Sequence, residues 1–153
     1  MSHSKLTTAT LPHALMAILM LLVMACGGKE TTVPVSDKVK KAWTAQTVKE
    51  NSTLVYTKGA TSNIRNYNGF RLDLSNPPAV SITDYDGLTF TGQYEVPSDT
   101  RLVLKNLNPQ PTGTNGTIEF TINSVSDNQL DLTRVTSSPK TGGTTNQYAL
   151  TNL

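Results

Sequence analysis

The sequence predicts an all-β fold: an antiparallel up-and-down β-barrel of about eight strands, with a two-sheet β-sandwich as the alternative. Apolar and polar side chains alternate along most of residues 70–150, and this period of two buries one face of a strand and leaves the other in water. A parallel sheet would instead show continuous apolar runs. Turn-forming residues separate the alternating segments, and no amphipathic helical pattern interrupts them. These features favour sequential hairpins.

Residues 1–25 have the pattern of an export signal peptide. Lys5 precedes an apolar run over residues 14–25, which is shorter than the ~20 residues that a membrane-spanning helix needs. The run ends at Ala25-Cys26-Gly27, which contains the only cysteine of the chain. This segment resembles the bacterial lipoprotein signal, in which the cysteine receives a diacylglyceryl group and becomes the new N-terminus. Cys26 is therefore the predicted lipidation site, and two or three acyl chains on one residue make a stable membrane anchor.

The residues after Cys26 predict where the lipid places the protein. Gly27 stands where an Asp would resemble an inner-membrane retention signal, so we expect the outer membrane, with the domain facing either the periplasm or the cell surface. Residues 26–37 contain two glycines, two adjacent threonines and one proline without apolar periodicity, and they indicate a flexible tether. Within it, Ser36 and Asp37 predict the N-cap of a short helical turn that extends through Lys41. Residues 38–153 are expected to form one barrel domain.

The strands are expected in order along this domain. Residues 42–48 and 53–56 form the first two, and alternating runs follow at residues 70–75, 80–83, 88–96, 101–105, 117–122, 130–133 and 148–150. Leu88 is expected on the inner face with Phe90 and Tyr94. Asp86-Gly87 predicts a two-residue type I′ turn, since both positions of that turn need positive φ. Asp127-Asn128 predicts another tight turn, and residues 108–116 and 137–143 are expected to be longer exposed loops.

Several classes of function are excluded by composition. Both histidines, His3 and His13, lie within residues 1–25, so the remaining chain holds neither a Ser-His-Asp or Cys-His catalytic set nor a His/Cys zinc site. Thirteen basic residues stand against eleven acidic ones, which gives no electrostatic footprint for nucleic acid. Asp84 and Asp86 supply too few oxygens for calcium. We therefore expect a monomeric, non-enzymatic protein without a metal or cofactor.

The chain also carries a resemblance to a known group of proteins. The lipid cysteine is followed by Trp43 near the start of the domain, by the hairpin over residues 79–94, and by the segments 101–105 and 117–133. Together these resemble the small lipocalin-like lipoproteins of Gram-negative bacteria. The resemblance implies an eight-stranded antiparallel barrel, with Trp43 as a plug at its closed end, and binding of a small hydrophobic ligand.

Candidate ligand-binding residues follow from the alternation. The expected walls of the lumen are Phe70, Leu72, Phe90, Leu104, Phe120 and Leu132, and the residues expected to rim its opening, beside turns, are Tyr67 and Tyr85. The alternative is a structural or protein-interaction module of the cell envelope, with a filled core and no small-molecule ligand. An eight-stranded barrel either fills its interior or holds one small ligand, so the space left inside the barrel separates the two functions.

Overall fold

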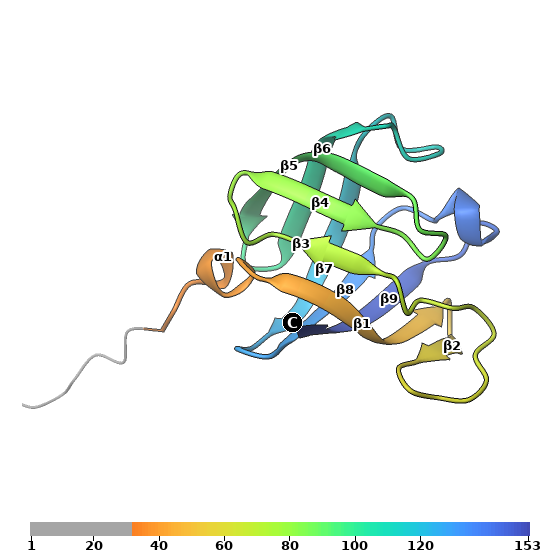
Figure 1. Cartoon of the computed structure of the whole chain (residues 1–153). Coiled ribbons are helices and arrows are strands. Elements are labelled where there is room, and N and C mark those ends of the chain that lie inside the picture. The colour runs from red at the N-terminus through yellow and green to blue at the C-terminus, as the bar shows by residue number, and fades with distance from the viewer. Residues whose placement is uncertain (1–31) are drawn as a thin grey trace, which may run out of the picture. The chain divides into compact units, whose positions relative to one another are not determined.

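A computed structural model describes residues 32–153, and its strands form one antiparallel sheet that closes on itself (Figure 1). The strands are β1 (Ala42–Glu50), β2 (Thr53–Thr57), β3 (Arg71–Asp73), β4 (Ala79–Thr83), β5 (Thr89–Ser98), β6 (Arg101–Asn108), β7 (Ile118–Val125), β8 (Gln129–Arg134) and β9 (Asn146–Asn152). A four-residue helix, α1 (Val35–Lys38), precedes them, and a 3-10 turn, η2 (Pro139–Thr141), lies between β8 and β9. The signal peptide and Cys26 lie outside the described residues.

Strand β1 closes the ring. Along one edge it pairs with β9, from Trp43↔Asn152 to Glu50↔Asn146. Along its other edge, the first half of β1 pairs with β3 and the second half pairs with β2. Every other pairing joins consecutive strands from β3 to β9. Because the first and last strands, β1 and β9, are hydrogen-bonded to each other, the sheet is closed, so the predicted up-and-down barrel is confirmed and the alternative sandwich is not formed. Strand β2 is an extra strand outside the eight-stranded ring.

The core consists of the inward side chains of the alternating runs. In β7, Ile118, Phe120 and Ile122 are buried, whereas Thr121 between them is exposed. Trp43 is fully buried, and its indole Nε1 donates to the carbonyl oxygen of Val39 at 2.9 Å. The backbone that follows α1 thus satisfies the polar group of the buried Trp43 side chain. Among residues 32–153, no helix is long and apolar enough to cross a membrane.

The predicted helical turn forms at least two residues earlier than expected, with Pro34 rather than Ser36 at its N-cap position. Helix α1 covers Val35–Lys38, and no side chain caps it. The carbonyl oxygen of Pro34 accepts hydrogen bonds from the amides of Asp37 and Lys38, so the helix begins at Val35. The predictions that Ser36 or Asp37 caps the helix and that it extends through Lys41 were wrong, because Pro34 already provides the start of the turn.

The hairpin between β4 and β5 forms where it was predicted, but with a longer loop. The ladder ends at Thr83↔Thr89, so residues 84–88 form the connection. Gly87 has a φ of 81°, whereas Asp86 is not among the residues with positive φ. A two-residue type I′ turn needs both, so that prediction was wrong. Leu88, expected on the inner face, is 54% exposed, because the five-residue loop places it before the ladder begins.

Candidate functional site

The two ends of the barrel differ in the inward side chains that they carry. At the end opposite Trp43, which we call the mouth, the inward positions are polar: Glu50 at the end of β1, Arg134 at the end of β8 and Asn146 at the start of β9. These side chains are only 8%, 6% and 1% exposed. Buried polar groups are costly unless they are paired, so the partners of each one indicate what the mouth can do.

Glu50 and Asn146 belong to one hydrogen-bonded network. The Oε1 of Glu50 accepts from Arg65 Nε at 2.6 Å and from the Tyr67 hydroxyl at 2.9 Å. The Nδ2 of Asn146 donates to the hydroxyls of Tyr67 and Tyr148, at 3.4 and 3.1 Å. Burial, with the nearby Tyr148 and the Glu50 carboxylate, raises the pKa of Tyr67 far above its usual value. The Tyr67 hydroxyl therefore stays protonated and bridges β1 to β9.

Tyr67 lies in the core and does not rim the opening as expected. Its side chain is fully buried, because Glu50 and Asn146 hold the hydroxyl inside and four aromatic rings lie within 6.2 Å of its own, centroid to centroid. Tyr85 lies at the mouth, half-buried, and its hydroxyl donates to the carbonyl oxygen of Lys140 at 2.9 Å. The guanidinium of Arg65 lies 4.7 Å from the centroid of the Tyr85 ring.

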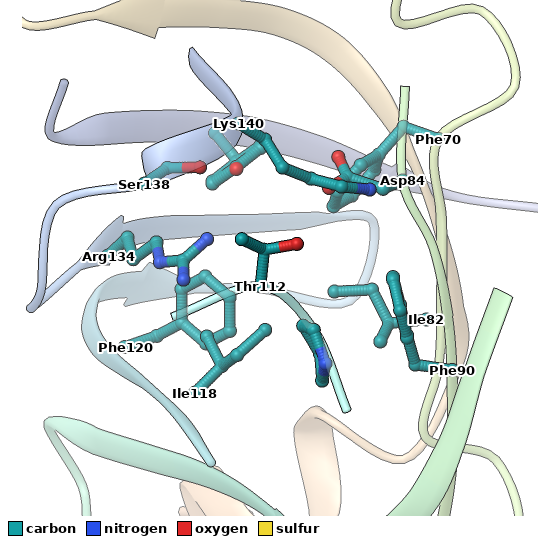
Figure 2. Close-up of a pocket in the computed structure, with 12 residues that line it drawn as sticks. Phe70, Ile82, Asp84, Phe90, Thr112, Ile118, Phe120, Arg134, Ser138 and Lys140 are labelled. Carbon is teal, nitrogen blue, oxygen red and sulfur yellow. The ribbon is translucent and has the colours of Figure 1, made fainter. Parts of the chain in front are cut away.

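The expected lumen walls all lie in the core, and half of them reach a cavity. Phe70, Phe90 and Phe120 line a small cavity at the mouth. Leu72, Leu104 and Leu132 are at most 1% exposed and are not among its lining residues. Figure 2 shows the cavity, whose lining is Phe70, Ile82, Asp84, Phe90, Pro111, Thr112, Ile118, Phe120, Arg134, Ser138, Lys140 and Tyr148.

The cavity is too small for a typical ligand. Its volume is about 20 Å³. A water molecule needs ~10–15 Å³ measured in this way, and pockets for drug-sized ligands have volumes of ~300–1,000 Å³. Depressions of about 310 to 450 Å³ also occur, but they are open troughs on the outside of the barrel. The barrel interior is therefore filled by side chains.

Two loops cover the mouth and touch each other. Pro111 and Thr112 reach the cavity from the β6–β7 loop, and Ser138 and Lys140 reach it from the η2 segment. A Cβ atom added to Gly113 would lie 2.8 Å from the Cγ of Pro139, which shows how closely the loops meet.

Lys140 fastens the η2 segment to the β4–β5 hairpin. Its Nζ lies 2.6 Å from Asp86 Oδ2, 3.5 Å from Asp84 Oδ2 and 5.1 Å from the centroid of the Phe90 ring. Partial burial of Asp86 opposes its ionisation, but the Lys140 ammonium and the Leu88 amide outweigh this effect and lower the pKa of Asp86. Asp86 is therefore ionised at neutral pH, and its ion pair with Lys140 holds the loop in place.

Sequence reasoning missed the polar residues of the mouth, although the alternation contained a signal for them. Arg134 follows Leu130 and Leu132 at a spacing of two, and Asn146 precedes Tyr148 and Leu150 at the same spacing. Extending each apolar run by one step places both residues on the inner face.

No protein-family model matches this chain, and a search of curated proteins also gave no match. Two solved structures are similar to it. One is a lipocalin-like protein from Bacteroides uniformis ATCC 8492, with 14% identity, a TM-score of 0.48, and coverage of 76% of this chain and 99% of that one. The other is an uncharacterized protein from Bacteroides eggerthii DSM 20697, with 12% identity, a TM-score of 0.44, and coverage of 74% and 98%. The eight-stranded barrel follows from the strand pairing of the chain itself.

Proposed function

We propose that this chain is a non-enzymatic lipoprotein of the bacterial outer membrane, anchored through Cys26, whose filled barrel acts as a monomeric interaction module of the cell envelope. The observation that carries the proposal is the packed interior. The cavity at the mouth has a volume of about 20 Å³, so the barrel in this conformation has no room to enclose a lipid. Of the two functions that the sequence leaves open, a filled core supports the interaction module.

The loops at the mouth are the parts of this module best placed to meet a partner. Leu88 in the β4–β5 loop is 54% exposed, and Val135, directly after β8, is 50% exposed. Each is an apolar side chain next to the end of a strand ladder, Leu88 before Thr89 of β5 and Val135 after Arg134 of β8. Apolar side chains presented on a rigid framework lose little conformational entropy on association.

The anchor is tested by labelling cells with radioactive palmitate. Wild-type protein should incorporate the label and sediment with outer-membrane vesicles. Cys26→Ser should incorporate none, and Ser36→Ala, a change at an exposed position of α1, should behave like the wild type. Absence of label from the wild-type protein would show that Cys26 is not lipidated.

A second candidate function is binding of a small hydrophobic ligand at the mouth. It is favoured by the apolar walls of the cavity, which are Phe70, Ile82, Phe90, Ile118, Phe120 and Tyr148. Entry requires the β6–β7 loop and the η2 segment to separate, because the closed cavity is too small. Titration with fluorescent fatty acids and native mass spectrometry distinguish the two functions. Saturable one-to-one binding that Phe120→Trp weakens supports a lumen site, whereas a folded protein without saturable binding supports the interaction module.

A further inference from the structure

Arg134 is the most buried arginine of the barrel and the one without a carboxylate partner. Arg65 pairs with Glu50, and the two exposed arginines pair with acidic side chains on their own or a neighbouring strand. Arg134 is 6% exposed. Its Nε is buried without a hydrogen-bond partner, and none of the salt bridges formed within residues 32–153 includes Arg134. The barrel thus holds one buried cation that the described residues do not neutralise.

An unpaired guanidinium in this position is costly. A guanidinium does not lose its proton at any pH at which proteins fold, so Arg134 cannot reduce the cost by becoming neutral. Taking such a charge out of water without a partner is unfavourable. Since Arg134 lines the cavity of about 20 Å³ at the mouth, a molecule in that cavity would be in position to supply the missing negative charge.

The surroundings of Arg134 include further hydrogen-bond donors. The Tyr148 hydroxyl accepts from Asn146 Nδ2 at 3.1 Å and donates to no other described residue, so its proton is available. Tyr148 lines the cavity, as do Ser138 and Thr112. In Figure 2 the guanidinium of Arg134 points from its strand toward Thr112, above the ring of Phe120. Donors and apolar walls therefore face the same small space.

The acidic side chain in the lining does not neutralise Arg134. Asp84 lies 3.5 Å from the Nζ of Lys140, which also pairs with Asp86 at 2.6 Å. The ammonium of Lys140 is thus the ion-pair partner of both carboxylates at the edge of the mouth. Arg134 is the lining charge that remains.

We propose that Arg134 and the mouth cavity form a binding site for a small carboxylate. The planar guanidinium fork accepts a carboxylate through two parallel hydrogen bonds, and Ile118 and Phe120 offer apolar contacts to a short alkyl group. The cavity of about 20 Å³ has room for little more than a water-sized group beside Arg134, so the rest of a bound acid would have to extend through the mouth. The site goes beyond the proposed function, because it requires neither the lipid anchor nor a partner protein.

The wild-type protein tests the site directly by NMR of its arginine Nε–H groups. Sodium acetate should shift the Arg134 signal saturably, while sodium chloride at equal ionic strength should not, and the exposed Arg71 should respond to neither salt specifically. Octanoate in place of acetate identifies the source of the carboxylate. Binding about tenfold or more tighter than acetate indicates an amphiphile that uses the apolar walls, and equal affinity indicates a small free acid. No saturable shift with either acid, or an equal shift with chloride, overturns the proposal.

Two variants separate binding from stability. Arg134→Gln should abolish the acetate-dependent rise in the thermal midpoint, whereas Arg71→Gln, which removes an exposed pair with Asp73, should retain it. Without acetate, Arg134→Gln should be at least as stable as the wild type, because it removes an uncompensated buried charge. If Arg134→Gln binds acetate as tightly as the wild type, the site is elsewhere. If this variant does not fold, the wild-type titration still decides.

Discussion

Phe120→Ala tests which face of β7 forms the core. Phe120 is 2% exposed, and its ring lies edge-on to Tyr148 with centroids 6.1 Å apart. Its neighbours across the ladders, Leu102 and Arg134, are held by strands β6 and β8. Because these ladders keep the walls apart, the space left by the ring cannot collapse fully, and the substitution leaves a cavity beside the one already present.

The expected loss follows from three contributions. Burial of a Phe side chain is worth about 1.5–3 kcal/mol, the edge-on pair adds about 0.5–1.5 kcal/mol, and the cavity brings the total to about 3–5 kcal/mol. For a domain of this size, the thermal midpoint should fall by roughly 4 °C for each kcal/mol.

Urea denaturation followed by circular dichroism measures this loss. Phe120→Ala should lower the midpoint without changing the slope, since the surface exposed on unfolding is nearly unchanged. Thr121→Ala, the next residue on the exposed face, is the matched control and should stay within about 0.5 kcal/mol of the wild type. Equal midpoints for the two variants would mean that the inner and outer faces have been assigned in reverse.

Two further predictions concern backbone packing and alkaline pH. Gly92→Ala should destabilise the barrel by about 1–3 kcal/mol, because the new Cβ would lie 2.6 Å from the Lys105 carbonyl oxygen. Gly69→Ala is the control and should be tolerated, since its Cβ meets nothing within 4 Å. Similar melting temperatures for the two variants would contradict the close approach of β5 to β6. Burial raises the pKa of four tyrosines, Tyr56, Tyr67, Tyr94 and Tyr148. Their contribution to stability is complete below the unfolded-state pKa of about 10 and is lost as pH rises above it, so tyrosinate absorbance should increase together with loss of the β-sheet signal. Ionisation of all four tyrosines in a protein that retains its sheet would contradict their burial.

The strands and their buried faces could be predicted because alternation is a local property. Each expected run in residues 70–150 needs only its own side chains to indicate which face is wet, as Phe120 between Glu119 and Thr121 shows. Closure of the ring was predictable only as one of two arrangements, since the same alternation also fits a sandwich. The β1–β9 ladder, which decides between them, joins residues about a hundred positions apart.

The mouth could not be predicted in the same way. Charged residues usually lie on the wet face, and this tendency conflicts with the alternation that continues from Leu132 to Arg134 and from Val48 to Glu50 on the inner face. Glu50 is tolerated on the inner face because Arg65 and Tyr67 donate hydrogen bonds to it. These contacts form only when the segment between β1 and β3, which includes β2, folds back over the barrel. The volume of the lumen depends on how side chains from eight strands interdigitate, which no single segment of sequence contains.

The pairing of the first strand of the barrel with the last has a consequence for how the chain acquires its structure. A chain that is synthesised from its N-terminus presents β1 long before β9 exists, so Glu50 has no β9 pairing partner until Asn146 has been made. Until then, the edge of β1 that β9 will occupy has unpaired backbone groups, which is the condition under which strands of different molecules associate. The large sequence separation also slows folding, since the entropy of closing the whole loop must be paid before the final ladder forms. Loss of the seven-residue strand β9 would therefore leave the barrel open at β1. It would also leave the unpaired edge of β1 exposed, so the chain would stay prone to aggregation.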